Sequence, residues 1–205
     1  MDLEGRSSKL LEDAVAQFTT LPGIGRKTAM RFALYLLRKS EEDVKQFTEA
    51  VLKMKMDTQF CSVCNNISDS DLCSVCSDKS RDRSIVCVVE GIHDIIAIES
   101  TSKYNGLFHV LGGVISPMDG IGPNDINVAS LIKRLETGEI KEIILALPTT
   151  MEGDTTNFYI NRKIDNSEIK VSILARGVAI GDELQYTDEI TLGQSILNRK
   201  PFVSS

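Results

Sequence analysis

The sequence contains no tryptophan, and aromatic residues make up only 5% of its 205 positions, so aliphatic side chains have to fill most of the core. It also lacks an excess of positive charge. The 23 basic residues against 29 acidic ones give a formal net charge of −6. This balance excludes a protein that coats nucleic acid over its whole surface, so any nucleic-acid site has to be local.

Long apolar runs are missing as well. The longest unbroken ones, residues 85–89 and 143–147, fall far short of the roughly 20 residues that cross a bilayer. Residues 1–6 lack the basic-then-apolar order of a signal peptide. We therefore expect a cytoplasmic protein with no membrane partner, in which the five cysteines are reduced.

Four of the cysteines form two Cys-x-x-Cys pairs, and they are Cys61, Cys64, Cys73 and Cys76. Each pair is typical of a tight turn that aims two sulfurs at one point, and two such turns suit tetrahedral Zn²⁺. Because no position is left open for a catalytic water, the pattern predicts one structural zinc ion per chain. Disulfides, unrelated free thiols and an iron–sulfur cluster are the alternatives. Cys87 lies in an apolar run and is interpreted as a buried apolar residue.

A glycine-rich turn, Leu-Pro-Gly-Ile-Gly, joins two predicted helices near the N-terminus. Gly23 and Gly25 permit a sharp turn and a close approach of the backbone to another molecule. Lys27 and Arg31 share one face of the second helix, and Arg26 adds charge at its start. This pattern predicts a sequence-independent contact with a DNA backbone and resembles the helix-hairpin-helix motif of many DNA-repair proteins. The alternative is a plain turn with surface cations.

The two parts of the chain differ in hydrophobic pattern. Apolar residues recur at helical spacing up to residue 56, with Ser7 or Ser8 as a plausible first cap and Ser40 with Asp43 as a cap for a third helix. From residue 84 onward, short apolar runs alternate with helical segments, which predicts parallel βαβ units. The predicted strands are 85–89, 107–111, 143–147 and 171–174, and the predicted helices are 92–100, 125–136, 155–163 and 188–199.

The predicted fold class is therefore α/β, with four parts. These are an N-terminal helical domain at 1–56, a small four-cysteine zinc module at 57–80, a parallel α/β sheet domain at 81–176, and a helical C-terminal tail at 177–205, for which the family resemblance given below implies a role in oligomerisation.

Acidic residues follow two of the predicted strands. Glu90 and Asp94 come after the first strand, and the segment Glu152-Gly153-Asp154 comes after the third. Ligands of open α/β sheets bind at that edge, and grouped carboxylates there suggest Mg²⁺. The alternative is that Glu90 and Asp94 only cap a turn and a helix start. The two histidines, His93 and His109, have no apparent acid–base partner and are interpreted as structural.

This arrangement resembles the Toprim domain of topoisomerases and primases, in which a strand-end Glu is joined by an Asp-x-Asp pair. Pro148 and Thr150 stand where those two aspartates would be. Phosphodiester chemistry is therefore not expected, and binding of Mg²⁺ is left open.

A helix-hairpin-helix, a four-cysteine zinc module and a Toprim domain in one short chain resemble the RecR family of bacterial recombination mediators over nearly the whole length. The characteristic segments are Leu-Pro-Gly-Ile-Gly, the four cysteines, the long loop 109–123, Pro148-Thr149 and residues 174–178. Two positions depart from the family pattern, since Leu147 and Asp154 stand where Asn and Glu are usual.

The resemblance implies a non-enzymatic DNA-binding protein of repair and recombination. It implies a homotetramer ring, a dimer of dimers, which holds single- or double-stranded DNA and acts with RecO and RecF to load RecA onto single-stranded DNA. Lys27 and Arg31 would then be DNA contacts. Glu90, Glu152 and Asp154 would be the docking site for RecO or RecF, with Asp94 and Gly153 beside them.

Two other functions compete with this interpretation. One is a Mg²⁺-dependent nuclease or topoisomerase that uses Glu90, Glu152 and Asp154. The other is a structural zinc protein whose helical hairpin binds another protein instead of DNA.

Overall fold

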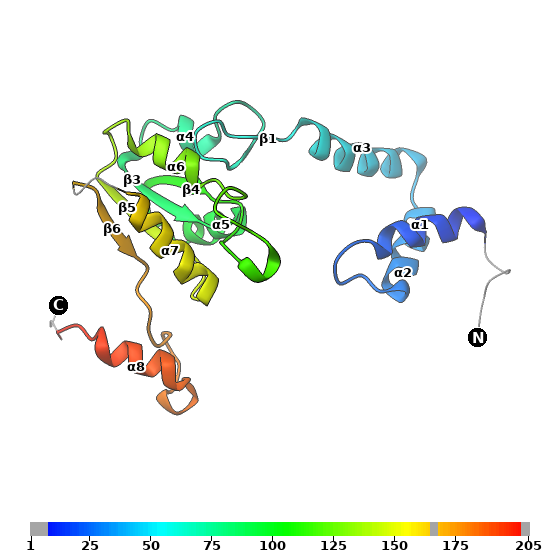
Figure 1. Ribbon diagram of the computed structural model, residues 1–205. Coiled ribbons are helices and arrows are strands. Elements are labelled where there is room, and N and C mark those ends of the chain that lie inside the picture. Colours follow the sequence, from blue (N-terminus) through cyan, green and yellow to red (C-terminus); the bar gives the residue numbers. More distant parts are fainter. Residues whose placement is uncertain (1–7, 165–167, 202–205) are drawn as a thin grey trace. The chain divides into compact units, whose positions relative to one another are not determined.

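The structure is a computed structural model that describes residues 8–164 and 168–201 (Figure 1). It divides into two compact units, Met1–Thr58 and Gln59–Ser205. None of the helices in the described ranges is long and apolar enough to span a membrane.

From residue 8 onward, the first unit consists of three helices, α1 (Lys9–Thr19), α2 (Arg26–Leu37) and α3 (Glu41–Asp57). Helices α1 and α2 pack around Val15, Ala29 and Ala33, and the two small alanines one turn apart let the helix backbones approach closely. At the turn between them, Gly23 has a φ of +75°, which favours glycine.

The caps of these helices agree with the sequence in part. The Ser40 side chain accepts a hydrogen bond from the Asp43 backbone N–H at the start of α3, as predicted. Ser8 is the residue that precedes α1, but its side chain makes no capping hydrogen bond. Ser7 lies outside the described residues.

Helix α3 has no buried residue, although its apolar side chains recur at helical spacing. Phe47, Val51 and Leu52 are 46%, 49% and 62% exposed. The first unit therefore presents an apolar helix face that its own residues do not cover.

The second unit is built on a four-stranded parallel sheet with the order β4-β3-β5-β6. The strands are β3 (Asp82–Val89), β4 (Gly106–Val110), β5 (Glu142–Ala146) and β6 (Lys170–Ile173). The connecting helices are α5 (Ile92–Ser100), α6 (Val128–Leu135) and α7 (Met151–Lys163), and α8 (Glu189–Leu197) follows in the tail. Two short 3-10 helices lie at Pro117–Asp119 and Leu184–Tyr186. Before the sheet come an antiparallel pair, β1 (Gln59–Phe60) and β2 (Ile67–Ser68), and the short helix α4 (Ser74–Ser77).

The predicted α/β class and the order of the large elements are confirmed, while several bounds and short elements differ, and β3 begins three residues earlier than predicted. The short elements β1, β2 and α4 were not predicted. Helix α6 is shorter than the predicted 125–136. Helix α7 begins at Met151 instead of 155, because the Thr150 side chain caps it by accepting a hydrogen bond from the Gly153 N–H. The acidic segment 152–154 therefore lies in the first helical turn, where carboxylates favour the helix dipole.

Candidate metal centre and nucleic-acid interface

The four paired cysteines form a compact, buried cluster. The Sγ atoms of Cys61, Cys64, Cys73 and Cys76 all lie within 4.8 Å of one another, and those of Cys64 and Cys73 are 3.6 Å apart. Tetrahedral zinc with bonds of about 2.3 Å separates its sulfur ligands by about 3.8 Å, so the cluster fits that ion. None of the five cysteines is in a disulfide.

Local backbone geometry holds the cysteine pairs as tight turns. In the first turn, the Asn65 N–H donates to the carbonyl oxygen of Cys61, and Asn65 has a positive φ of 59°. In the second, Cys73 caps α4, and its Sγ accepts from the Cys76 N–H.

The thiols of the cluster differ in the direction of their pKa shifts. A hydrogen bond from the Cys64 thiol lowers the pKa of Cys76 to about 6, and the same bond raises the pKa of Cys64. Binding of Zn²⁺ requires the thiolate form of its cysteine ligands, so the zinc affinity of the cluster depends on pH. By contrast, burial raises the pKa of Cys87 to about 12, which agrees with the prediction that Cys87 is a buried apolar residue.

The cysteine segment packs on the edge of the parallel sheet. The Val110 N–H of the edge strand β4 donates to the carbonyl oxygen of Cys64 at 2.8 Å. The Asn65 side-chain amide donates to the Ser130 hydroxyl of α6 at 3.2 Å. The four cysteines also belong to the same hydrophobic core as the sheet. Metal binding and the stability of the sheet are therefore coupled.

His109 is a fully buried side chain of β4. Its Nε2 lies 3.0 Å from the carbonyl oxygen of Asn127, which can only accept, so Nε2 carries the proton. The buried Nδ1 has no hydrogen-bond partner. Burial lowers the pKa of His109 to about 4. The structural interpretation of His109 is consistent with this neutral, enclosed ring.

This burial predicts a pH dependence of stability. The folded-state pKa lies below the ordinary value, so stability is lost as the pH falls from about 6.5 to about 4. A shift of this size corresponds to about 3 kcal/mol. Urea unfolding at a series of pH values should show this slope in the wild-type chain and a shallower one in His109→Gln, which keeps an N–H donor but does not titrate. Equal slopes in the two proteins would contradict the prediction.

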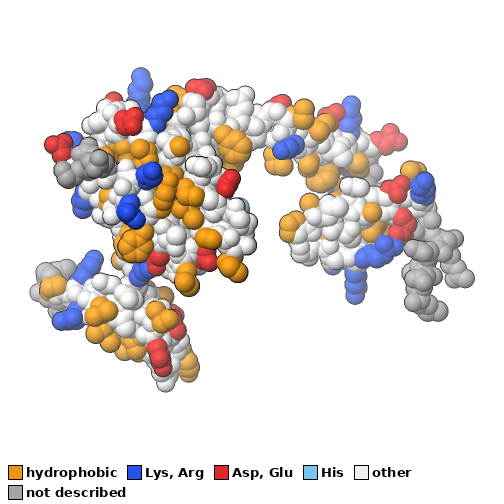
Figure 2. Space-filling model, in the orientation of Figure 1, with side chains coloured by type: hydrophobic (Ala, Val, Ile, Leu, Met, Phe, Trp, Pro, Cys, Tyr) orange, Lys and Arg blue, Asp and Glu red, His pale blue; other side chains and the backbone are white. Residues whose placement is uncertain are grey.

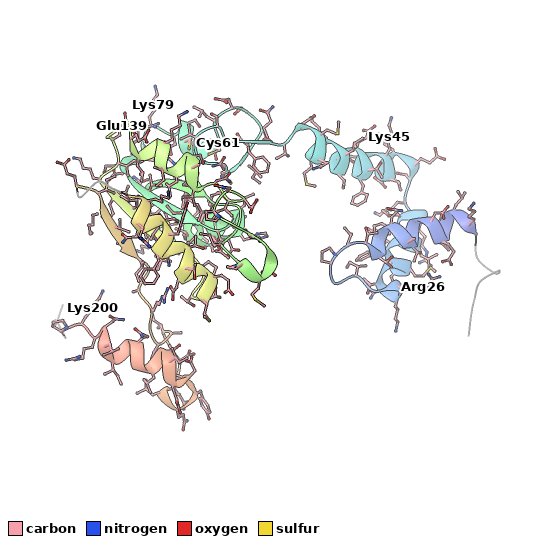
Figure 3. All side chains as sticks on the ribbon, in the orientation of Figure 1. Arg26, Lys45, Cys61, Lys79, Glu139 and Lys200 are labelled. Carbon is pink, nitrogen blue, oxygen red and sulfur yellow. The ribbon has the colours of Figure 1, made fainter. Side chains whose placement is uncertain are left out.

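The cations of the glycine turn and α2 lie at the surface. Lys27 and Arg31 are exposed side chains of α2, four residues apart, and Figure 2 shows basic side chains that project from this unit. Arg26, labelled in Figure 3, forms an ion pair with Glu12 of α1. Gly25 is the residue that precedes the helix, and its carbonyl oxygen accepts from the Ala29 N–H. Lys27 and Arg31 thus lie on one exposed face of α2.

The acidic residues at the strand ends take part in different local contacts. Asp94 accepts a hydrogen bond from the Gly91 N–H at 2.9 Å, so it caps α5, which was the alternative interpretation of this residue. Glu90 and Asp94 line a cavity of about 650 Å³, and His93 lies beside them. Within the described residues, only the four cysteines form a group of three or more metal-ligating side chains close enough to hold one ion.

Asp154 is held by a residue that the sequence did not indicate. Both Nη atoms of Arg176 contact its carboxylate, and these hydrogen bonds lower the pKa of Asp154. Arg176 lies 22 residues downstream, where no spacing rule connects the two. Gly153 faces the carbonyl oxygen of Pro148 so closely that no Cβ fits there. Among the described residues, the Glu152 side chain shows no hydrogen bond or ion pair like the one that holds Asp154.

A helical hairpin, a buried four-cysteine centre and a four-stranded parallel α/β sheet define a modular protein with a centre of the zinc-finger type. The family models agree with each part. They are the RecR helix-hairpin-helix at residues 11–55, the RecR four-cysteine zinc finger domain at 58–78, the Toprim domain at 84–175 and the RecR C-terminal region at 177–200.

Curated relatives match the chain over nearly its whole length. The recombination protein RecR of Phocaeicola vulgatus is 57% identical and covers 97% of each chain. That of Porphyromonas gingivalis W83 is 59% identical over 97% of this chain and 96% of its own, and that of Flavobacterium johnsoniae is 52% identical over 96% and 95%. The chain belongs to the RecR family. This membership supports a role in DNA recombination and repair, and together with the cysteine cluster it supports a structural zinc ion.

Proposed function

We propose that this chain is a non-enzymatic recombination mediator of the cytoplasm, which binds single- and double-stranded DNA through α2. The observation that carries the proposal is the exposed pair Lys27 and Arg31 on one face of a helix that follows a glycine turn. Backbone N–H groups at a helix start and two aligned cations suit phosphates and carry no sequence preference. Gly23, Gly25 and Arg26 complete the site by shaping the turn and its charge.

We propose further that copies of this chain form a homotetramer ring, a dimer of dimers. In the first unit, α1, α2 and α3 line a largely apolar cavity of about 880 Å³, which includes Leu11, Leu36 and Phe47. In the tail, Ile190 and Leu197 of α8 are 79% and 72% exposed. Uncovered apolar faces at both ends of one chain support two self-contacts. Several weak basic sites in one ring would also reconcile the net charge of −6 with DNA binding.

The partners in this proposal are RecO and RecF, with which the ring loads RecA onto single-stranded DNA. Their docking site would include Glu90 and Glu152. Three neighbouring residues would shape the surface: Asp94 caps α5, Gly153 packs against Pro148, and Asp154 pairs with Arg176. Pro148 and Thr150 at the positions of the Asp-x-Asp pair support a docking role for the Toprim domain in place of phosphodiester chemistry. We also propose that the domains of the chain meet between residues 56 and 57, 80 and 81, and 176 and 177.

The test is DNA binding by Lys27→Ala/Arg31→Ala. Each lost phosphate contact lowers the salt slope of binding by about one, so affinity should fall at least about tenfold at moderate salt. Fluorescence anisotropy with labelled DNA at several salt concentrations measures both quantities, and light scattering reports the molar mass of the same samples.

The matched control is Lys53→Ala/Lys55→Ala, which removes two exposed cations from α3 of the same unit. This control should keep the wild-type affinity. Unchanged binding in the α2 variant, or an equal loss in both variants, would refute the assignment of the site.

A further inference from the structure

The exposed basic face of α2 extends beyond Lys27 and Arg31. At the helical spacing of 3.6 residues per turn, Tyr35 lies one turn after Arg31, and Arg38 lies directly after the helix on the same side. All four side chains are exposed. From Lys27 to Arg38 the face is about 16 Å long. Residues 22–39 contain no acidic residue, so nothing on α2 itself neutralises this stripe.

Tyr35 is the aromatic side chain in this stripe, and it is 59% exposed. The Lys39 ammonium lies 5.2 Å from the centroid of its ring. The other aromatic side chains of α1 and α2 differ from it, because Phe18 and Phe32 pack against each other edge to face at 5.8 Å. Tyr35 therefore presents an aromatic ring at the surface among Arg31, Arg38 and Lys39.

The ring itself does not line the apolar cavity of this unit, although Lys39 does. The α2 residues that line the cavity are Ala33, Leu36 and Leu37, and Tyr35 is not among the lining residues. On the helix, Ala33 and Leu36 lie on the side opposite to Lys27 and Arg31. The Tyr35 ring therefore points away from the cavity-lining side of α2.

We propose that Tyr35 is a stacking platform for an unpaired base of single-stranded DNA, with Arg31 and Arg38 on the phosphates at either side. Every base offers a π-face, so an aromatic ring between cations binds single strands without sequence preference. Bases in a duplex are already stacked on their neighbours, so Tyr35 adds strand selectivity to a site whose cations bind either form. The inference rests on the proposed function and assigns the single strand as the preferred substrate of the same site.

The absence of tryptophan from the sequence allows a direct test of stacking. Tyr35→Trp places a single indole at the proposed platform, and Phe158→Trp places one on α7 of the other unit, where Phe158 is 72% exposed. Titration with an oligothymidylate should quench the fluorescence of Tyr35→Trp, and an equal length of duplex should quench it much less. Phe158→Trp should respond to neither. Equal quenching by single strand and duplex, or none, would overturn the proposal.

Affinities of Tyr35→Ala and Tyr35→Phe complete the experiment. Tyr35→Ala should weaken single-strand binding about tenfold and duplex binding less than about twofold, whereas Tyr35→Phe should keep wild-type affinity for both. An equal loss on both substrates, no loss on either, or a changed molar mass in light scattering would assign the ring to another role and overturn the inference. If instead the wild-type chain binds neither substrate, the proposed function fails as well, and that outcome is distinct from a wild type that binds DNA independently of Tyr35.

Discussion

Removal of zinc should unfold the cysteine segment and destabilise the parallel sheet that carries it. Structural zinc sites supply about 10–16 kcal/mol of apparent binding free energy, which in small domains is folding free energy. Here the four cysteines lie in the same core as β3, β4 and β5. A chelator should therefore lower the melting temperature of the whole second unit, measured by circular dichroism, while a metal-sensitive dye reports one zinc ion released per chain.

A second consequence of zinc loss concerns the edge of the sheet. The Val110 N–H of β4 now donates to the carbonyl oxygen of Cys64, and all five residues of β4 are buried. Without the cysteine segment this apolar strand would expose unpaired backbone groups, and exposed edges of that kind template aggregation. Light scattering during chelation should thus show growing particles.

The matched control for zinc loss is the fifth cysteine. Cys87 is buried like the other four but lies outside the cluster. Cys61→Ser should lose zinc and behave like the chelated wild type, whereas Cys87→Ala should keep one zinc ion per chain and lose only about 1–2 kcal/mol through a small cavity. A chelated chain that keeps the melting temperature and particle size of the untreated protein would show that the metal has no structural role.

The sequence predicted those features whose signals are local. The spacing of the cysteine pairs predicted the cluster that the structure brings together, since each tight turn is encoded within four residues. The helical spacing of Lys27 and Arg31 likewise predicted a shared face. The alternation of apolar runs and helices predicted the parallel sheet, although it missed β1, β2 and α4, which are too short to show a period.

The features that escaped prediction depend on contacts between distant residues. Glu12 lies 14 residues before Arg26, and their ion pair requires α1 and α2 to pack together first. Arg176 meets Asp154 only after β6 has joined the sheet. The early start of α7 depends on the hydrogen bond from the Gly153 N–H to the Thr150 side chain, which makes position 153 part of the first turn.

The substitution Gly153→Ala should destabilise the second unit strongly, although alanine is the better helix former. In α7 the exchange would improve helix propensity by about 1 kcal/mol. The new Cβ, however, would overlap the carbonyl oxygen of Pro148, which is backbone and cannot rotate away. Displacing α7 from the end of β5 should cost about 3 kcal/mol. This steric cost exceeds the gain in helix propensity, so the free energy of unfolding should fall by about 2 kcal/mol. Urea unfolding of the full chain measures it.

Gly193→Ala provides the comparison, because Gly193 lies within α8 and a Cβ there would meet no atom within 4 Å. That variant should be more stable than wild type by up to about 1 kcal/mol. A Gly153→Ala chain as stable as Gly193→Ala would show that α7 can shift without penalty. The expected loss of stability in Gly153→Ala also affects how the proposed docking of RecO or RecF is tested. If a Gly153 variant fails to bind a partner, the cause would be the displaced helix α7 and not a lost contact. The role of the Glu152 carboxylate is therefore better tested with Glu152→Gln, which keeps the size of the side chain and removes its charge.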